Sequence, residues 1–318
     1  MSDAALKWRP ADETSRVLEQ LEQIILGKSG QLKLCLACIL ARGHLLIEDI
    51  PGVGKTTLAH ALAHTLGLTY QRIQFTSDLL PADIVGVSIY ERQHDRFQFH
   101  RGPIFAQLVL ADEVNRATPK AQSALLEAME ERQITADGVT HDLPEPFFVV
   151  ATQNPTWQIG TFPLPESQLD RFLMRISLGY PQPDLERKLL AGRDRRELLR
   201  ELSPALDPQT ATRVLRDLQE AATQMHVAPA LLDYVQALVA FTRDSAAFHA
   251  GLSPRAAIAL LRAAQAWALI AGHRGVLPED VQAITPGIVG HRLKPRGDAG
   301  PQQPDEIGRF VLESVPVS

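Results

Sequence analysis

The sequence predicts an α/β fold: a core built on a parallel five-stranded sheet flanked by helices, followed by a smaller all-helical domain. Short apolar runs alternate with helical stretches from about residue 14 to residue 180. Three of these runs are apolar enough to be buried on both faces, which is typical of parallel strands covered by helices. Beyond the two prolines of "YPQPDLER" (180–187), the segments read as helices.

Each of the five predicted strands is bounded by turn residues. They are "HLLIED" (44–49), "YQRIQF" (70–75), "QLVLADE" (107–113), "FFVVATQNP" (147–155) and "FLMRISL" (172–178). The segment 90–105 alternates polar with apolar or aromatic residues, and we expect a hairpin there that is inserted into the fold.

The predicted division is a core at 1–182, with an N-terminal helical segment, and a helical domain at 183–318. Several helices of the second domain begin at Asp or Ser followed by Pro and end at Gly, as capping chemistry prefers. The last two dozen residues, around "RGDAGPQQPDEIG", are expected to be loosely ordered.

Composition narrows the class of protein. With 32 basic and 37 acidic residues, the net charge of -5 gives no electrostatic argument for binding nucleic acid or an anionic membrane. No apolar run approaches the roughly 20 residues that a membrane-spanning helix needs, and the first residues lack a secretory pattern, so we expect a cytoplasmic protein.

Cys35 and Cys38 lie in an apolar helical segment and are expected to be core residues. His60 and His64 have a spacing that could bind zinc, but they lack the glutamate of the common zinc motif.

The stretch "EDIPGVGKTTLAHALA" (48–63) predicts a phosphate-binding loop of the P-loop type. It matches G-x-x-x-x-G-K-[ST] except that Asp49 stands at the first glycine. An apolar strand precedes it and a helix is expected from about Lys55, so unpaired backbone N–H groups and the positive end of the helix dipole would face a triphosphate. The nucleotide-binding residues predicted here are Pro51, Gly52, Val53, Gly54, Lys55, Thr56 and Thr57.

Individual roles follow from the chemistry of this loop. Gly52 and Gly54 would allow close approach of the backbone to the phosphates of ATP. Lys55 would reach the β- and γ-phosphates, and Thr56 would hold Mg²⁺ through its hydroxyl.

Two further strands end in polar residues. In "LVLADEVNR" (108–116), Asp112 suits the Mg²⁺ shell and Glu113 could polarise a water for attack on the γ-phosphate. In "VVATQNP" (149–155), Asn154 could hydrogen-bond the γ-phosphate and the attacking water. Ligands of open α/β sheets bind at such carboxyl ends of strands.

Two arginines complete the candidate catalytic set. Arg171 lies in "LPESQLDRFLM" and Arg255 opens a helix in "LSPRAAIALL". An arginine supplied across a subunit contact neutralises transition-state charge, and one from a mobile domain reports phosphate loss. By residue statistics alone, both would be partners in surface ion pairs.

Together these residues resemble the AAA+ ATPases, and among them the MoxR family. The resemblance covers about residues 24–257 and is carried by "PGVGKTTLA", "QFTSDLLPADIVG", "RGPIFAQLVLADEVNRATPKAQSALLEAMEERQIT", "ATQNP" and "TFPLPESQLDRFLM". It implies that Lys55 and Thr56 belong to Walker A, and Asp112 and Glu113 to Walker B. It further implies that Asn154 is sensor 1, Arg171 the arginine finger and Arg255 sensor 2.

The resemblance also implies where the rest of the site lies. The adenine would sit near Leu26 and Gly27, residues 86–101 would be an insert in the second helix of the core, and 135–142 a hairpin before sensor 1. Arg116 and Arg132 also lie on segments that could face a neighbouring subunit, so the identity of the finger stays open.

The family implies a ring-shaped homo-oligomer, usually a hexamer, which acts as a chaperone-like remodelling or metal- and cofactor-insertion ATPase. A protein with a von Willebrand factor A domain is the implied partner, and the second domain would be the lid. A nucleic-acid-associated ATPase of the same superfamily is the alternative; the absence of a "GAFTGA" loop argues against it. Taken alone, the phosphate loop would also fit a small-molecule kinase, a GTPase or a nucleotide-gated scaffold.

Overall fold

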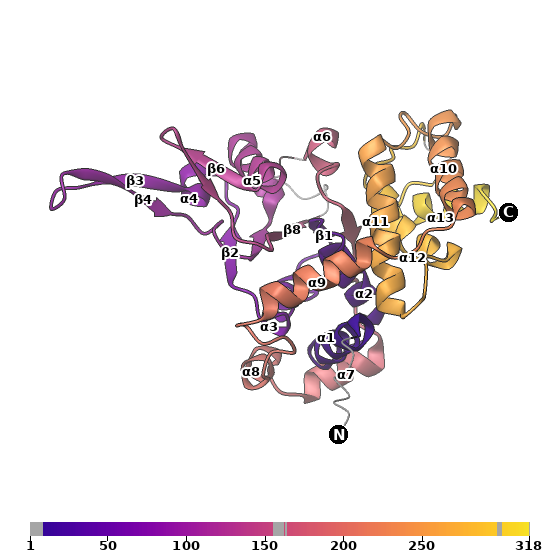
Figure 1. Cartoon of the computed structure of the whole chain (residues 1–318), viewed down its shortest axis with the longest axis horizontal. Helices are drawn as coiled ribbons and strands as arrows, with labels where there is room; N and C mark the ends of the chain where they lie inside the picture. The colour runs from indigo at the N-terminus through magenta and orange to yellow at the C-terminus, as the bar shows by residue number, and fades with distance from the viewer. Residues whose placement is uncertain (1–8, 155–161, 163, 298–300, 318) are drawn as a thin grey trace, which may run out of the picture.

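The computed structural model describes residues 9–154, 162, 164–297 and 301–317 (Figure 1). The elements of the first half are α1 (Pro10–Ile24), α2 (Ser29–Leu40), β1 (Leu45–Glu48), α3 (Lys55–Thr65), β2 (Tyr70–Gln74), α4 (Pro81–Val85), β3 (Gly86–Glu91), β4 (Arg96–Arg101), β5 (Leu108–Asp112), the 3₁₀ turn η1 (Val114–Arg116), α5 (Pro119–Glu131), β6 (Gln133–Ala136), β7 (Val139–Asp142) and β8 (Phe148–Gln153). The second half contains α6 (Glu166–Leu169), β9 (Met174–Ile176), α7 (Pro183–Ala191), α8 (Arg195–Glu201), α9 (Ala211–Thr223), α10 (Pro229–Asp244), α11 (Pro254–Ala271), α12 (Pro278–Val289) and α13 (Pro304–Ser314).

The predicted five-stranded parallel sheet is confirmed. Its strand order is β2-β5-β8-β1-β9, and every neighbouring pair is parallel. Each strand lies inside the range that its apolar run predicted; the last residue of the predicted strand 147–155 lies outside the described residues. Because β5, β8 and β1 are adjacent and parallel, their carboxyl ends meet at one edge of the sheet.

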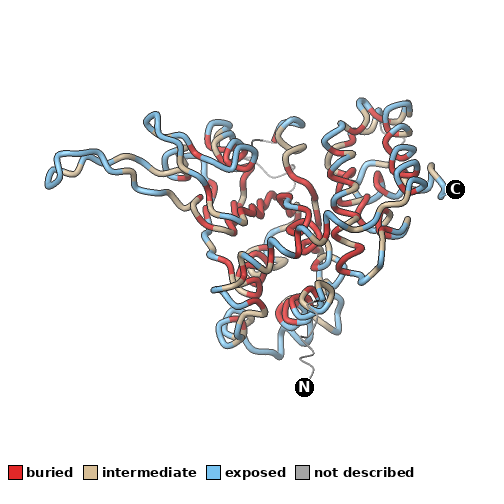
Figure 2. The backbone as a smooth tube through the Cα atoms, in the orientation of Figure 1, coloured by how far each residue is buried: buried red, intermediate tan, exposed pale blue. Residues whose placement is uncertain are grey.

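Helices cover both faces of this sheet. Leu45, Ile47 and Leu110 point into a hydrophobic core shared with α1, α2, α3, α9 and α11. Leu46 and Val109 point to the other face, where α5 covers them. This alternation explains why the strands read as continuous apolar runs. Figure 2 shows buried backbone along the sheet and the helices that cover it, and also within the C-terminal helices.

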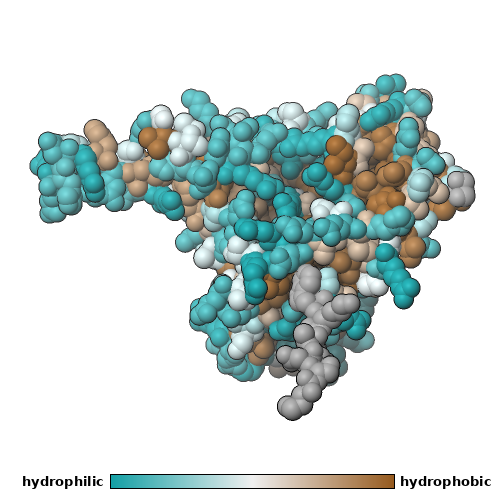
Figure 3. Space-filling model, viewed as in Figure 1, coloured by the Kyte–Doolittle hydropathy of each residue, from teal (hydrophilic) through white to brown (hydrophobic). Residues whose placement is uncertain are grey.

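Both expected hairpins are present. β3 and β4 form an antiparallel arm that extends far from the body of the molecule (Figure 1), and β6 pairs with β7. The rings of Phe99 and His141 stack with centroids 4.3 Å apart, which joins the two hairpins. The arm is mostly hydrophilic in the space-filling view (Figure 3), although the side chain of Phe97 is exposed.

The C-terminal half is helical, apart from the short strand β9, which completes the sheet. One expectation about it is wrong: residues 304–314 are not loosely ordered but form helix α13, which packs on α12. Ile307 and Val311 are buried on one face of α13, and Gly308 lies against the backbone of Pro286. The Pro and Gly residues that suggested disorder therefore begin the helix and permit its close approach.

The proposed boundary near residue 182 stays a prediction. Helices α9 and α11 contact α2 of the N-terminal segment, and one continuous hydrophobic core includes residues from both sides of the boundary. Among the described residues, no helix combines the length and the apolar character required to cross a lipid bilayer.

Candidate active site

The predicted phosphate loop connects β1 to α3. Gly52 and Gly54 have φ of 87° and 96°, in the left-handed region that glycine adopts without strain. A Cβ at either residue would meet no protein atom within 4 Å, so both face open space at the amino end of α3. The loop therefore leaves its backbone accessible at the amino end of a helix, where phosphate binds.

Asp49, which replaces the first glycine of the motif, turns its carboxylate away from this surface. Its Oδ2 accepts hydrogen bonds from the backbone N–H groups of Leu178 (2.6 Å) and Gly179 (2.7 Å) and from the hydroxyl of Ser177 (3.0 Å). Its Oδ1 accepts from the N–H of Ile50 at 2.8 Å. The aspartate thus ties the phosphate loop to the segment that leaves β9.

Lys55 is buried at the first position of α3. Its Nζ donates to the carbonyl oxygen of Asp49 (2.6 Å) and to Oδ1 of Asn154 (3.0 Å). Burial lowers the pKa of Lys55, and the nearby carboxylates of Asp49, Asp112 and Glu113 oppose that shift. The ammonium group is therefore held at the end of the loop by groups from two different strands.

Asp112, at the end of β5, is held on both carboxylate oxygens. The hydroxyl of Thr152 on β8 donates to Oδ1 at 2.6 Å. The guanidinium of Arg72 on β2 donates to Oδ2 from Nε (3.0 Å) and from a terminal nitrogen (2.6 Å). A carboxylate that is almost fully buried is thereby paired and hydrogen-bonded, as burial of a charge requires.

Glu113 has a left-handed backbone, with φ 58°, and its N–H donates to the hydroxyl of Thr152 at 2.9 Å. Its side chain accepts from Nδ2 of Asn154 (3.1 Å) and from Nε2 of Gln74 (3.0 Å). Nε of Arg116 lies 3.3 Å from the same carboxylate. The strained backbone turns Glu113 toward the polar cluster at the end of the sheet.

The structure thus brings together Lys55, Asp112, Glu113 and Asn154, as the sequence predicted. It adds Arg72, Gln74 and Thr152, which sequence reasoning missed. Gln74 ends β2 just as Asn154 follows β8, so the search for polar residues at strand ends would have found it. Arg72 and Thr152 lie one or two residues inside their strands, where no local pattern marks them.

Leu26 and Gly27, the residues proposed near the adenine, form the turn between α1 and α2. Gly27 has φ 68°, and a Cβ there would collide with the side chain of Leu185 on α7. The next residue, Lys28, donates from Nζ to the carbonyl oxygen of Tyr180 at 2.9 Å. The turn therefore packs against the same segment that Asp49 holds.

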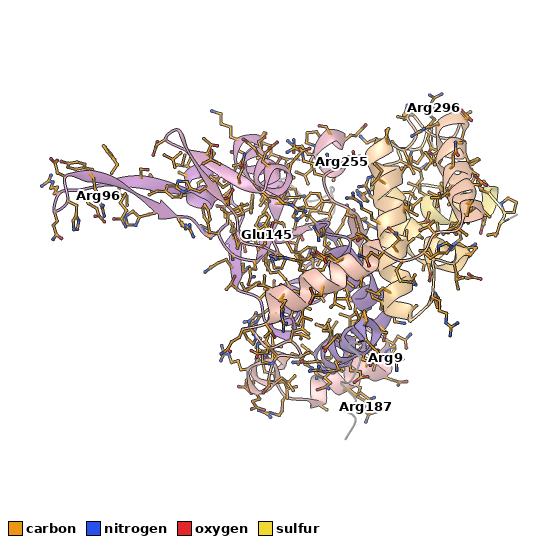
Figure 4. All side chains as sticks on the ribbon, viewed as in Figure 1. Arg9, Arg96, Glu145, Arg187, Arg255 and Arg296 are labelled. Carbon is orange, nitrogen blue, oxygen red and sulfur yellow. The ribbon has the colours of Figure 1, made fainter. Side chains whose placement is uncertain are left out.

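Arg171 and Arg255 do not join this cluster. Arg171 lies just before β9, at the edge of the sheet opposite the carboxyl ends of the strands, and Arg255 lies in the first turn of α11. Both guanidinium groups contact Glu130 of α5, at 2.9 Å and 3.2 Å. In Figure 4, Arg255 lies between α6 and α11.

These two arginines line a cavity of about 500 Å³. It also includes residues that precede β1, such as Gly43 and His44, which confirms its place at the amino ends of the strands. Of the remaining arginines considered for the finger, Arg132 lines this cavity, whereas Arg116 contacts Glu113 of its own chain.

The cysteines and histidines considered for metal binding have structural contacts instead. Cys35 and Cys38 are fully buried, and burial raises the pKa of both thiols. The rings of His60 and Tyr70 stack, and His64 donates to the carbonyl oxygen of Leu202. No group of three His, Cys, Asp or Glu side chains in the described part of the chain could hold a metal ion.

Comparison with known proteins agrees with this geometry. Residues 44–174 match the ATPase family associated with various cellular activities (AAA), and residues 240–309 match the AAA lid domain. The chain is 42% identical over 304 residues to the YeaC protein of Bacillus subtilis, covering 95% of this chain and 94% of that protein. It is 39% identical over 311 residues to the chaperone MoxR1 of Mycobacterium tuberculosis, covering 94% and 81% of the two chains.

A crystal structure from Cytophaga hutchinsonii, described as that of a candidate ATPase, superimposes with a TM-score of 0.85 at 33% identity and covers 97% of this chain and 96% of that one. Family, fold and the polar cluster at the phosphate loop agree with one another. The chain belongs to the MoxR family of AAA+ ATPases.

Proposed function

We propose that this protein is a Mg²⁺-dependent ATPase whose complete active site forms between two copies of the chain in a ring. The observation that carries the proposal is the separation of the candidate catalytic groups. Lys55, Glu113 and Asn154 lie at the carboxyl ends of the strands, whereas Arg171 and Arg255 lie at the amino ends. One chain cannot apply both sets to one nucleotide, but two adjacent chains can.

The first set supplies the nucleotide side of the site. The N–H groups of the loop and Lys55 bind the phosphates of ATP, and Glu113 orients and deprotonates the attacking water. Asn154 contacts both Lys55 and Glu113, so it aligns the ammonium group with the base. Arg171 and Arg255 of the neighbouring chain then stabilise the charge that develops on the γ-phosphate.

Thr56 and Asp112 are the residues that would hold Mg²⁺. Hydroxyl and carboxylate oxygens are ligands of the kind that Mg²⁺ prefers, together with phosphate oxygens and water. The hydroxyl of Thr56 has no hydrogen-bond partner among the described residues, whereas Asp112 is shared with Arg72. When bound, the ion neutralises phosphate charge and orients the phosphates.

Complementation between two inactive variants tests this arrangement. Lys55→Ala removes the nucleotide side of a chain, and Arg171→Ala removes the arginine side. Each variant alone should lose ATPase activity, and a mixture should regain part of it because some boundaries pair two intact halves. ATPase activity per chain in the parent protein should also rise with protein concentration. Mixtures that stay inactive, or activity that is independent of concentration, would contradict a site shared between chains.

The proposed use of ATP is remodelling of client proteins, including metal or cofactor insertion, with a von Willebrand factor A domain protein as the proposed partner. The chaperone name of the relative from Mycobacterium tuberculosis supports this use.

Glu113→Gln should bind ATP without hydrolysing it and so retain the assembled, client-bound state. Recovery of this chain alone in affinity capture with that variant and ATP would count against remodelling, whereas ATPase stimulation by DNA would favour the nucleic-acid alternative.

A further inference from the structure

Glu130, at the end of α5, joins two arginines that are far apart in the sequence. Its Oε2 lies 2.9 Å from a terminal nitrogen of Arg171, and its Oε1 lies 3.2 Å from a terminal nitrogen of Arg255. One carboxylate therefore holds two guanidinium groups, one on each oxygen.

This contact contributes little to the stability of the fold. The side chains of Glu130 and Arg255 are 36% and 50% exposed, and exposed ion pairs are each worth about 0–1 kcal/mol. Helix α5 is fixed instead by its buried face, which includes Leu125, Leu126 and Met129. The consequence of the contact is positional: two like charges converge because a carboxylate lies between them.

The surroundings of this trio favour an anionic ligand. Six arginines line the cavity, and they are Arg42, Arg132, Arg171, Arg255, Arg262 and Arg292. The acids among the described lining residues are Glu130 and Asp170, and Asp170 is paired with the buried Arg292 at 2.7 Å. His44 adds no charge near neutral pH, because burial lowers its pKa to about 4.

The two arginines keep donors free for such a ligand. A guanidinium carries five N–H groups, and the ion pair with Glu130 uses one terminal nitrogen of each. Among the described residues neither guanidinium has another hydrogen-bond partner, so its remaining N–H groups are available to an oxyanion that enters the cavity.

We propose that Glu130 is a positioning residue for the ATPase reaction: it holds Arg171 and Arg255 at one spacing so that both reach the same phosphate of ATP bound to the neighbouring chain. This inference rests on the proposed function, because the phosphate belongs to a second copy of the protein. Glu130 itself does not touch the nucleotide.

Replacement of Glu130 tests the inference. In Glu130→Gln one arginine loses its acceptor and faces an amide donor, and in Glu130→Ala the arginines repel each other unopposed. Both variants should lower kcat about tenfold or more, because misplaced groups lose transition-state stabilisation. KM and the binding of a fluorescent ATP analogue should change less than about twofold, since the phosphate loop of the same chain lies at the opposite edge of the sheet.

The controls separate positioning from a general effect on the helix. Glu127→Gln makes the same charge change one turn earlier on α5, at an exposed residue with no ion pair in the described part of the chain, and should leave kcat unchanged. Glu130→Asp keeps the charge on a shorter side chain and should restore part of kcat.

The outcomes distinguish this inference from the proposed function. If Arg171→Ala and Arg255→Ala lower kcat but Glu130→Gln leaves it unchanged, the positioning role is wrong and the shared site stands. A rise of kcat in Glu130→Gln would also overturn it, since Glu130 would then compete with phosphate for the arginines. If neither arginine variant lowers kcat, the shared site itself is wrong, and the inference fails with it.

Discussion

Asp49 shows how a single side chain adapts a phosphate loop that lacks its first glycine. The carboxylate points away from the loop and accepts four hydrogen bonds, three of them from residues 177–179. The close approach of the backbone to phosphate is left to Gly52 and Gly54. Both have left-handed conformations, and no protein atom lies within 4 Å of where their Cβ would be. The substitution in the motif is therefore compatible with phosphate binding and adds a link to the segment after β9.

Arg72 gives a prediction at the same scale. Its guanidinium donates twice to one oxygen of Asp112, the residue proposed to help hold Mg²⁺. Arg72→Gln removes a positive charge from that carboxylate, so Mg²⁺ should bind more tightly. An ion pair of this exposure is worth up to about 1 kcal/mol, which corresponds to a Mg²⁺ affinity about fivefold higher.

The measurement is the Mg²⁺ concentration at half-maximal ATPase activity, together with the thermal stability of the nucleotide-free protein. Arg92→Gln, on the exposed tip of the β3–β4 arm, is the matched control and should change neither quantity. An unchanged or higher Mg²⁺ requirement in Arg72→Gln would show that Arg72 does not compete with the cation.

At the scale of elements, the close contact between α12 and α13 holds residues 304–314 against the helical domain. Gly308 of α13 lies against α12, and a Cβ there would collide with Cα of Pro286. Such a collision forces the two helices apart. The sequence around residue 300 is rich in Pro and Gly, which explains why it suggested loose order, but one Gly is needed for this contact and one Pro begins the helix.

Substitution of Gly308 by Ala should lower the free energy of unfolding by about 1–3 kcal/mol, the usual cost of overpacking. Gly30→Ala, near the start of α2, is the control, because a Cβ there meets no atom within 4 Å. That variant should gain a few tenths to about 1 kcal/mol, since alanine is the better helix former. Urea unfolding of both variants measures the difference; equal effects would show that the α12–α13 contact is not tight.

At the scale of the whole molecule, buried histidines make stability depend on pH. His44 begins the segment that leads into β1; its Nδ1 accepts from the N–H of Val149 and its Nε2 donates to the carbonyl oxygen of Met129. The contact with Val149 requires the neutral ring, because a protonated Nδ1 cannot accept a hydrogen bond, whereas donation from Nε2 would persist in the charged ring. Burial lowers the pKa of His44 from 6.5 to about 4, and burial lowers the pKa of His291 well below its ordinary value in the same way.

Between pH 6.5 and about 4 the unfolded chain binds a proton at residue 44 that the native protein does not bind. The free energy of unfolding should therefore fall as the pH falls through this window, by about 3 kcal/mol from His44 alone. His44→Asn keeps an acceptor for Val149 but does not titrate, so its stability should depend less steeply on pH. Urea unfolding between pH 7 and 4.5 gives the comparison, and identical slopes for the two proteins would contradict the assignment.

The sequence by itself determined the strands, the phosphate loop and the cluster of Lys55, Asp112, Glu113 and Asn154. Buried parallel strands and phosphate cradles leave local patterns, because apolar runs, turn glycines and acids at strand ends are adjacent in the chain. Only the tertiary structure decided that Arg72 and Gln74 of β2 hold the two acids, and that Glu130 joins Arg171 to Arg255 at the opposite edge. Those contacts depend on the strand order β2-β5-β8-β1-β9 and on the packing of α5, α6 and α11. The sequence did not predict these contacts because the side chains meet across the fold and not along the chain. No local pattern specifies which strands are neighbours.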